Sequence, residues 1–290
     1  MRAKALLPAL AVAALLAALL GTGGCTTGPP APAGSGSPGS GSPVVTHGDQ
    51  EGGAGSDAKA AAERAARFRA WGVPLLALPP RPPAVKPVRT GGAEIPVISR
   101  VPTEQKIVFV TFDDGLEKDP RFVAMMRDLR IPFTMFLTDD IIKDDYSYFK
   151  PLQALGNTIQ DHTLSHPDLP TESLARQTHE ICAQQSRLAR EYGVRPGLFR
   201  PPYGDLNADT RAAVTSCGGL RAIILWRETM QIKRVTFQDP GRKFHPGDII
   251  LAHFRGPAQL KGESMTKMVA AMLRGIAAQG YTVARLDDYV

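Results

Sequence analysis

Short apolar segments alternate with helix-like segments along the C-terminal two thirds of this 290-residue chain. Seven of them, each bounded by turn residues, are predicted to be strands: 107–112, 132–137, 158–161, 197–200, 220–225, 248–253 and 281–285. Four intervening segments have helical spacing or composition: 119–129, 172–192, 208–216 and 264–279. Repeated strand–helix units imply parallel strands, in an open doubly wound sheet or in a barrel. The alternation therefore predicts one α/β domain, which we place at residues 95–290.

The first 25 residues are predicted to be an export signal. Arg2 and Lys4 supply a positive start, and residues 5–20 form an uncharged stretch rich in Ala and Leu. Small residues precede Cys25, as at a bacterial lipoprotein processing site, although Thr22 stands where such sites usually have Leu. We expect a lipid anchor at Cys25 that holds an exported protein on the outer side of the cell membrane. The alternative is ordinary signal cleavage, with Cys25 removed or left free.

Two connecting segments are expected between the signal and the domain. Residues 26–56 are rich in Pro, Gly and Ser and have almost no large apolar side chain, which predicts a disordered linker. Residues 57–94 are predicted to be a short helix at 58–71 followed by a Pro-rich tether.

Composition limits the classes of partner. The net charge is +6 and the pI is about 9.3, but the basic residues are scattered, so we exclude nucleic acid as a partner. We also expect the protein to be a monomer. Cys182 and Cys217 are the only cysteines of the domain. In an oxidising compartment they could form a disulfide, and two separate thiols are the alternative.

Two short segments contain the residues best suited to metal binding and proton transfer. Asp113 and Asp114 follow a predicted strand and precede Gly115, and His162 and His166 lie four residues apart. One carboxylate and two imidazoles could hold a divalent ion, leaving one carboxylate for proton transfer. Alone, each segment is as well explained by a surface turn or by a chance pair of histidines. Together they favour a metal-dependent active site.

These segments and two others resemble the polysaccharide deacetylase family, also called carbohydrate esterase family four, with its NodB-type domain. The resemblance spans about 105–290 and rests on four ordered motifs, at 111–115, 162–169, 199–204 and 248–253. It implies a distorted (β/α) barrel of about seven or eight parallel strands that forms a single catalytic domain.

The resemblance also implies roles for individual residues. Asp114, His162 and His166 would bind zinc, with cobalt and nickel as alternatives. Asp113 would be the general base that takes a proton from metal-bound water, the nucleophile. His253 would be the general acid for the leaving amine, because a free imidazole titrates near neutral pH.

Five further residues complete the expected site. Arg200 would hold Asp113, and the Tyr203 backbone N–H would stabilise the oxyanion. Leu251 would line the pocket for the acetyl methyl group, with Trp226 as a second candidate. The family's fourth motif, an Asp-Trp pair, is absent here, and Glu228 is the candidate to support the acid in its place; a surface Glu is the alternative.

The resulting hypothesis is a metal-dependent hydrolase that removes N-acetyl or O-acetyl groups from an extracellular polysaccharide. Peptidoglycan or another N-acetylglucosamine polymer is the first expected substrate, and acetylated xylan is another. Two rival hypotheses are a hydrolase of a small non-peptide amide on the same scaffold and a non-catalytic carbohydrate-binding surface protein.

Overall fold

The computed structural model describes residues 51–92 and 94–290, and side chains from Ser56 onward. The expected signal, the lipid-anchor residue Cys25 and most of the expected linker lie outside the described residues. No helix among the described residues is both long enough and apolar enough to cross a bilayer.

The segment before the predicted domain packs against it. Helix α1 (Glu51–Ala70) begins earlier than the helix expected at 58–71 and within the expected linker. Phe68, Val73 and Leu76 are buried in the main core cluster, and the Trp71 indole donates a 2.7 Å hydrogen bond to Asp128. Residues 57–94 were expected to be a tether, but their apolar side chains make part of this segment integral to the folded unit.

The centre of the fold is one mostly parallel sheet, with the strand order β1-β6-β5-β4-β3-β2-β9-β7-β8, and with β10 paired to β2. Every pairing among the described strands is parallel except that of β8 with β7. The strands are β1 (Val97–Ile98), β2 (Ile107–Asp114), β3 (Thr134–Leu137), β4 (Thr158–Asp161), β5 (Leu198–Phe199), β6 (Ala222–Ile224), β7 (Glu228–Met230), β8 (Val235–Phe237), β9 (Ile249–His253) and β10 (Thr282–Val283). The sequence did not predict the short strands β1, β7 and β8.

The sheet curls, so that its β1 end approaches β9. The chain after β1 bonds to the start of β9, because the Val101 N–H donates to the Gly247 carbonyl at 2.8 Å and the Ile249 N–H donates to the Ser99 carbonyl at 3.4 Å. These bonds bring together strands that are far apart in the strand order, as the predicted barrel requires.

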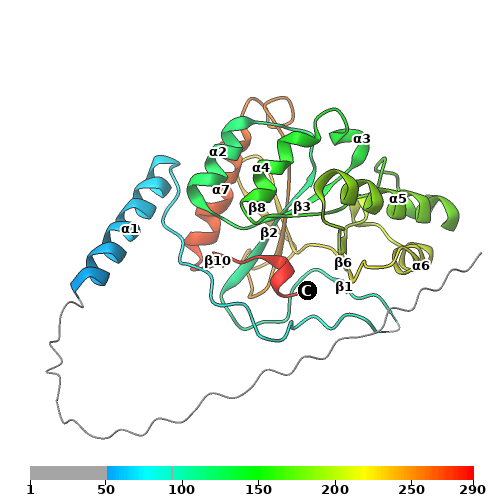
Figure 1. Ribbon diagram of the computed structural model, residues 1–290, viewed down its shortest axis with the longest axis horizontal. Coiled ribbons are helices and arrows are strands. Elements are labelled where there is room, and N and C mark those ends of the chain that lie inside the picture. Colours follow the sequence, from blue (N-terminus) through cyan, green and yellow to red (C-terminus); the bar gives the residue numbers. More distant parts are fainter. Residues whose placement is uncertain (1–50, 93) are drawn as a thin grey trace, which may run out of the picture. The chain divides into compact units, whose positions relative to one another are not determined.

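Helices cover the outside of the curled sheet (Figure 1). They are α2 (Pro120–Leu129), α3 (Asp139–Ile142), α4 (Phe149–Ala154), α5 (Leu174–Tyr192), α6 (Ala208–Ser216) and α7 (Met265–Ala278), with 3₁₀ turns η1 (Tyr146–Tyr148), η2 (Leu169–Thr171), η3 (Pro202–Gly204) and η4 (Leu286–Asp288). The N-cap of α5 is Ser173, whose side chain accepts the Arg176 N–H, so this helix begins two residues later than the start predicted at residue 172.

Alternation along β2 separates the barrel interior from the helical layer. Ile107 and Phe109 belong to one core cluster, whereas Val108 and Val110 pack with the residues of the helices. Successive strand side chains point to opposite faces, so Asp113 continues the interior row to the end of the strand. The apolar pattern of β2 thus aims one carboxylate into the barrel.

A disulfide joins Cys182 of α5 to Cys217 at the C-cap of α6, across a sequence separation of 35 residues. It ties together two helices that also pack against each other through Ile181 and Val214.

We predict that Cys182→Ser combined with Cys217→Ser lowers the free energy of unfolding by about 3–4 kcal/mol, because the unfolded chain regains the entropy of an open loop. Urea denaturation of both proteins measures this difference, and thiol titration of unfolded wild-type protein checks that no free thiol is present beforehand. Equal unfolding midpoints would contradict the prediction.

Candidate active site

The two neighbouring aspartates share a site because β2 ends at Asp114. Asp113 is 2% exposed and points into the barrel, whereas Asp114 has a left-handed φ of 71° that turns its side chain back toward the same rim. Gly115 follows with a φ of 95°, and a Cβ at this position would collide with Ile142. The turn therefore requires glycine, and it brings two carboxylates to one point.

Asp114, His162 and His166 form a set of candidate metal ligands. One ligand atom from each lies within 4.8 Å of the others, and the Asp114 Oδ1 is 3.6 Å from the Nε2 of both histidines. This Oδ1 is buried and accepts no hydrogen bond among the described residues, which is costly for a carboxylate oxygen. A divalent cation between these three atoms would satisfy it, so the donor set fits a metal ion.

His162 is held in the tautomer that a metal ligand needs. Its Nδ1 lies 2.7 Å from the Arg200 carbonyl oxygen and donates its proton to it, which leaves the Nε2 lone pair facing Asp114. Burial lowers the pKa of His162 to about 4, so the ring is neutral at neutral pH. A metal ion would not have to displace a proton from it.

The loop that carries the histidines is fixed by a helix that the sequence did not connect to the site. Glu180 of α5 is fully buried and accepts both the N–H and the hydroxyl of Ser165 at 2.8 Å. Thr163 and His166 have positive φ values of 68° and 59°, which non-glycine residues seldom adopt. The Glu180 contacts help to hold this strained loop in the ligand geometry.

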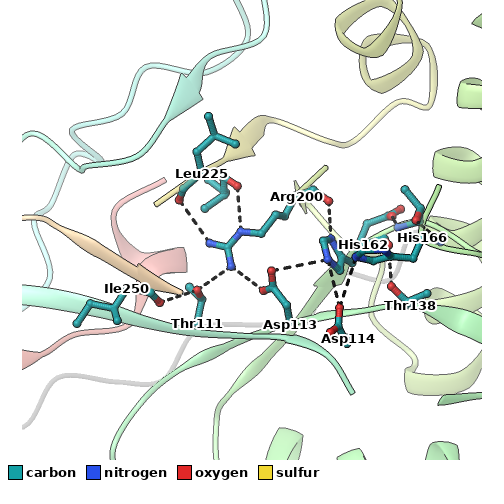
Figure 2. A network of polar contacts seen from close by, with 12 residues as sticks. Thr111, Asp113, Asp114, Thr138, His162, His166, Arg200, Leu225 and Ile250 are labelled. Carbon is teal, nitrogen blue, oxygen red and sulfur yellow. Dashed lines mark hydrogen bonds and ion pairs between the residues drawn. The ribbon is translucent and has the colours of Figure 1, made fainter. Parts of the chain in front are cut away.

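A buried ion pair fixes Asp113 in the interior. Arg200 is fully buried; its Nη1 donates to the Asp113 Oδ1 at 2.6 Å and to the Thr111 hydroxyl at 2.7 Å (Figure 2). Its Nε donates to the Ile224 carbonyl and its Nη2 to the Leu225 carbonyl. Thr111, which the sequence analysis did not single out, thus shares the guanidinium with Asp113.

Burial raises the pKa of Asp113 to about 6, although Arg200 opposes this shift. The Asp113 Oδ2 is not used by Arg200 and lies 3.7 Å from the His162 Nε2. One carboxylate oxygen is therefore fixed and the other faces the candidate metal site, with a proton affinity suited to a base near neutral pH.

A cavity of about 270 Å³ joins these residues to the rest of the predicted site. Its lining consists of Asp113, Asp114, His162, His166, Pro201, Tyr203, Trp226, Leu251, His253 and Arg255. The structure thus brings together every residue expected to bind the metal, the substrate or the proton, and Arg200 lies behind Asp113. Arg255 was missed by sequence analysis because it lies outside the four motifs.

Tyr203 and Trp226 both line the cavity. Tyr203 has a positive φ of 61° and an exposed ring, whose centroid is 4.7 Å from that of His166. Trp226 packs on Gly204, where a Cβ would lie 2.8 Å from the indole, and its ring lies 5.6 Å from the Arg200 guanidinium carbon. The Tyr203 ring therefore lies beside a candidate metal ligand, and the Trp226 ring lies beside the arginine that holds the candidate base.

His253 lines the cavity as expected, but its protonation state differs from the sequence-based expectation. Burial, and then the nearby Arg255 charge, lower the pKa of His253 to about 3 rather than leaving it near neutrality. The ring is therefore neutral at neutral pH, and it would gain a proton only when negative charge develops beside it.

Glu228 is not the partner of His253. In the register of the sheet Glu228 pairs with Ile250, three residues before His253, and its carboxyl lies near that of Asp248, which accepts from Arg100. The His253 Nδ1 has no hydrogen-bond partner among the described residues. The proposed substitution for the missing aspartate is therefore wrong, because β7 places Glu228 at the wrong end of the neighbouring strand.

The fold and the site together define a parallel α/β-barrel protein with a candidate metal centre at its rim. The model of the polysaccharide deacetylase family matches residues 100–221. An uncharacterized protein of Streptomyces coelicolor is 37% identical over 196 residues, which cover 67% of this chain and 77% of that protein. This chain belongs to the polysaccharide deacetylase family, as its sequence motifs predicted.

Two further similarities agree with this assignment. The peptidoglycan-N-acetylmuramic acid deacetylase PdaA of Bacillus subtilis is 26% identical over 197 residues, covering 64% of this chain and 72% of that protein. The solved structure of a family-four pseudoenzyme from Bacillus anthracis superposes with a TM-score of 0.56 and 20% identity, over 67% of this chain and 68% of that one. The second similarity concerns the fold alone, and the predicted single-domain barrel is confirmed.

We predict that His166→Ala folds but binds Zn²⁺ more than about 100-fold more weakly, because loss of a ligand costs more than loss of a residue that only orients one. Calorimetric titration of metal-free protein measures the affinity. The control is His179→Ala, which removes an exposed histidine of α5. Unchanged Zn²⁺ affinity in His166→Ala would remove this residue from the ligand set.

A second prediction uses the buried Glu228. Burial, and then Asp248, raise the pKa of Glu228 from 4.5 to about 9, so the folded protein retains a proton that the unfolded chain releases. The free energy of unfolding of wild type therefore falls as pH rises from 4.5 toward 9, by up to about 1.4 kcal/mol per pH unit. Glu228→Gln resembles the protonated acid, so its unfolding free energy should increasingly exceed that of wild type over this range.

Urea denaturation at several pH values between 5 and 9 measures this difference. Turnover at pH 7 should be unchanged in Glu228→Gln, because Glu228 does not contact His253. A pH-independent difference in stability would contradict the raised pKa, and lost turnover would restore Glu228 as a support for the acid.

Proposed function

We propose that this chain is a metal-dependent deacetylase that hydrolyses N-acetyl groups of a cell-surface polysaccharide, with peptidoglycan as the substrate. The observation that carries the proposal is the free Asp113 oxygen beside the candidate ligands Asp114, His162 and His166. A base next to three ligands is the arrangement of a hydrolytic metal centre with an open position.

Zinc suits the donor set of one carboxylate and two imidazoles, and cobalt and nickel accept the same ligands. Such an ion supplies Lewis acidity, which lowers the pKa of water and polarises the acetyl carbonyl. Asp113 takes the proton of the attacking water, and Arg200 holds the carboxylate in position through one oxygen.

Four other residues of the cavity handle the leaving group and the acetyl group. His253, which first gains a proton as negative charge develops beside it, passes that proton to the departing amine. The Tyr203 backbone N–H donates to the oxyanion; such a donor contributes roughly 3–4 kcal/mol to transition-state stabilisation. Leu251, with Trp226 beside it, encloses the acetyl methyl group.

Peptidoglycan is favoured over acetylated xylan, and an N-acetyl over an O-acetyl group, because relatives such as PdaA act on peptidoglycan. A non-catalytic role has one argument in its favour, since a fold neighbour is a pseudoenzyme. Against this, the candidate base and all three candidate ligands face one cavity here. A small amide as substrate has no specific observation in its favour.

We further propose that the protein is exported, anchored in the membrane by a lipid on Cys25, and monomeric. The support is the sequence of residues 1–25 and the Pro/Gly/Ser-rich segment that follows. An anchored enzyme with such a linker could reach the cell wall from the outer side of the cell membrane.

We predict that Asp113→Asn lowers turnover about 10²–10⁴-fold while Zn²⁺ affinity is retained, because the amide cannot accept a proton. Asp114→Asn should instead lose Zn²⁺, and added Zn²⁺ should partly restore its activity. Acetate release from N-acetylated peptidoglycan, with and without a chelator, together with metal content, distinguishes the two variants. An active Asp113→Asn protein would refute the proposed mechanism.

We predict that wild-type protein sediments with membranes of a bacterial host and is extracted by detergent. Cys25→Ala should remain unprocessed or appear in the culture medium, because the lipid attachment site is gone. Fractionation with immunoblotting checks this, and wild-type protein found entirely in the medium would argue against lipidation.

A further inference from the structure

Arg255 is an active-site cation that the proposed mechanism does not use. It lines the same cavity as the candidate base, acid and metal ligands. Among residues 51–92 and 94–290 no carboxylate forms an ion pair with Arg255, and no hydrogen bond of its side chain occurs. The cavity thus contains a guanidinium without a protein partner.

The backbone explains why this side chain enters the cavity. Phe254 is fully buried in the helical layer against Phe112, so the alternation of an extended chain sends His253 and Arg255 to the opposite side. Leu251, two residues before His253, lines the cavity as well. Arg255 therefore continues the interior row of β9 beyond the end of the strand.

The position of Arg255 is fixed on both sides. The Phe254 N–H donates to the Asp113 carbonyl at 3.2 Å, and its carbonyl accepts the Glu117 N–H at 3.0 Å. Gly256 lies so close to the Glu117 carboxylate that a Cβ there would collide with it. A guanidinium on such a fixed backbone is well placed to recognise a ligand.

Once a divalent ion is bound, the charges in the cavity do not require Arg255. Arg200 pairs with Asp113 at 2.6 Å, and such an ion would compensate Asp114, on which the Arg255 charge acts without forming an ion pair. A divalent ion would itself supply positive charge to the oxyanion. In the absence of an anion, Arg255 also opposes protonation of His253. The remaining positive charge is best explained by a substrate that carries a negative one.

We propose that Arg255 is a specificity-determining residue that pairs with a substrate carboxylate located beside the reacting acetamido group. This inference rests on the proposed function. N-acetylmuramic acid has this chemistry, because it carries the acetamido group on one ring carbon and a lactyl carboxylate on the oxygen of the next. N-acetylglucosamine has the same acetamido group without the charge. The fork of a guanidinium binds a carboxylate through two parallel hydrogen bonds.

The experiment compares two substrates that differ only in this charge. One is a glycan strand of alternating N-acetylglucosamine and N-acetylmuramic acid without peptides, and the other is the same strand with its carboxylates converted to primary amides. Acetate release is measured with full-length, Zn²⁺-loaded wild type, Arg255→Gln, Arg255→Lys and the control Arg190→Gln, which removes an exposed arginine of α5.

Wild type should prefer the carboxylate strand. Arg255→Gln should lose about 10–100-fold in kcat/KM on that strand, mainly through KM, and little on the amide strand. Arg255→Lys should fall between wild type and Arg255→Gln, and Arg190→Gln should match wild type. Equal losses on both strands would place Arg255 in the reaction itself, and no loss on either would show that it binds nothing; both results overturn the inference.

Failure of the proposed function gives a different pattern. If wild type releases acetate from neither strand, the proposed function fails, and the inference fails with it. If wild type works equally well on both strands, the function stands and the inference alone is overturned. A second measurement, binding of N-acetylmuramic acid and N-acetylglucosamine to Zn²⁺-loaded Asp113→Asn, tests the same preference with catalysis blocked. Equal affinities for the two sugars would also overturn the inference.

Discussion

The buried pair between Arg200 and Asp113 is the contact on which both the barrel interior and the site depend. Arg200 leaves the end of β5 and bonds to Asp113 and Thr111 of β2 and to the carbonyls of Ile224 and Leu225 at β6. Removing one partner of a buried pair typically costs about 3–5 kcal/mol, because the other charge remains without compensation. Removing the Asp113 side chain would therefore also disturb the centre of the fold, whereas Asp113→Asn keeps an oxygen that can accept from the Arg200 Nη1.

Strain is concentrated where this pair meets the candidate ligands. Of the seven non-glycine residues with positive φ among the described residues, four lie at the site: Asp114, Thr163, His166 and Tyr203. Each such residue costs on the order of 1–3 kcal/mol and persists only when its surroundings hold it. The surroundings here are the Gly115 turn, the Glu180 contacts and the packing of Tyr203 on His166. Favourable packing in the rest of the barrel thus offsets the backbone strain of the candidate active site.

The sequence predicted what short-range patterns encode. The long strand β2, the alternation of strands with helices, and the gathering of Asp113, Asp114, His162 and His166 all follow from periodicity and from motifs at strand ends. Strands of two or three residues, such as β1 and β7, carry no detectable period, so the register that separates Glu228 from His253 was not predictable. The pKa of His253 depends on burial and on Arg255, which only the folded chain brings together.

The missing aspartate of the fourth motif changes how the acid can work. The His253 Nδ1 has no carboxylate partner among the described residues. Burial, and then the nearby Arg255 charge, lower the pKa of His253 and keep the ring neutral before the reaction. Negative charge must therefore reach the cavity during turnover if His253 is to become an acid. An anionic substrate that pairs with Arg255 would supply part of this charge, and the oxyanion of the reaction would supply the rest. In such a site, substrate recognition and acid strength are coupled, because Arg255 contributes, after burial, to the low pKa of His253 and would also pair with the substrate.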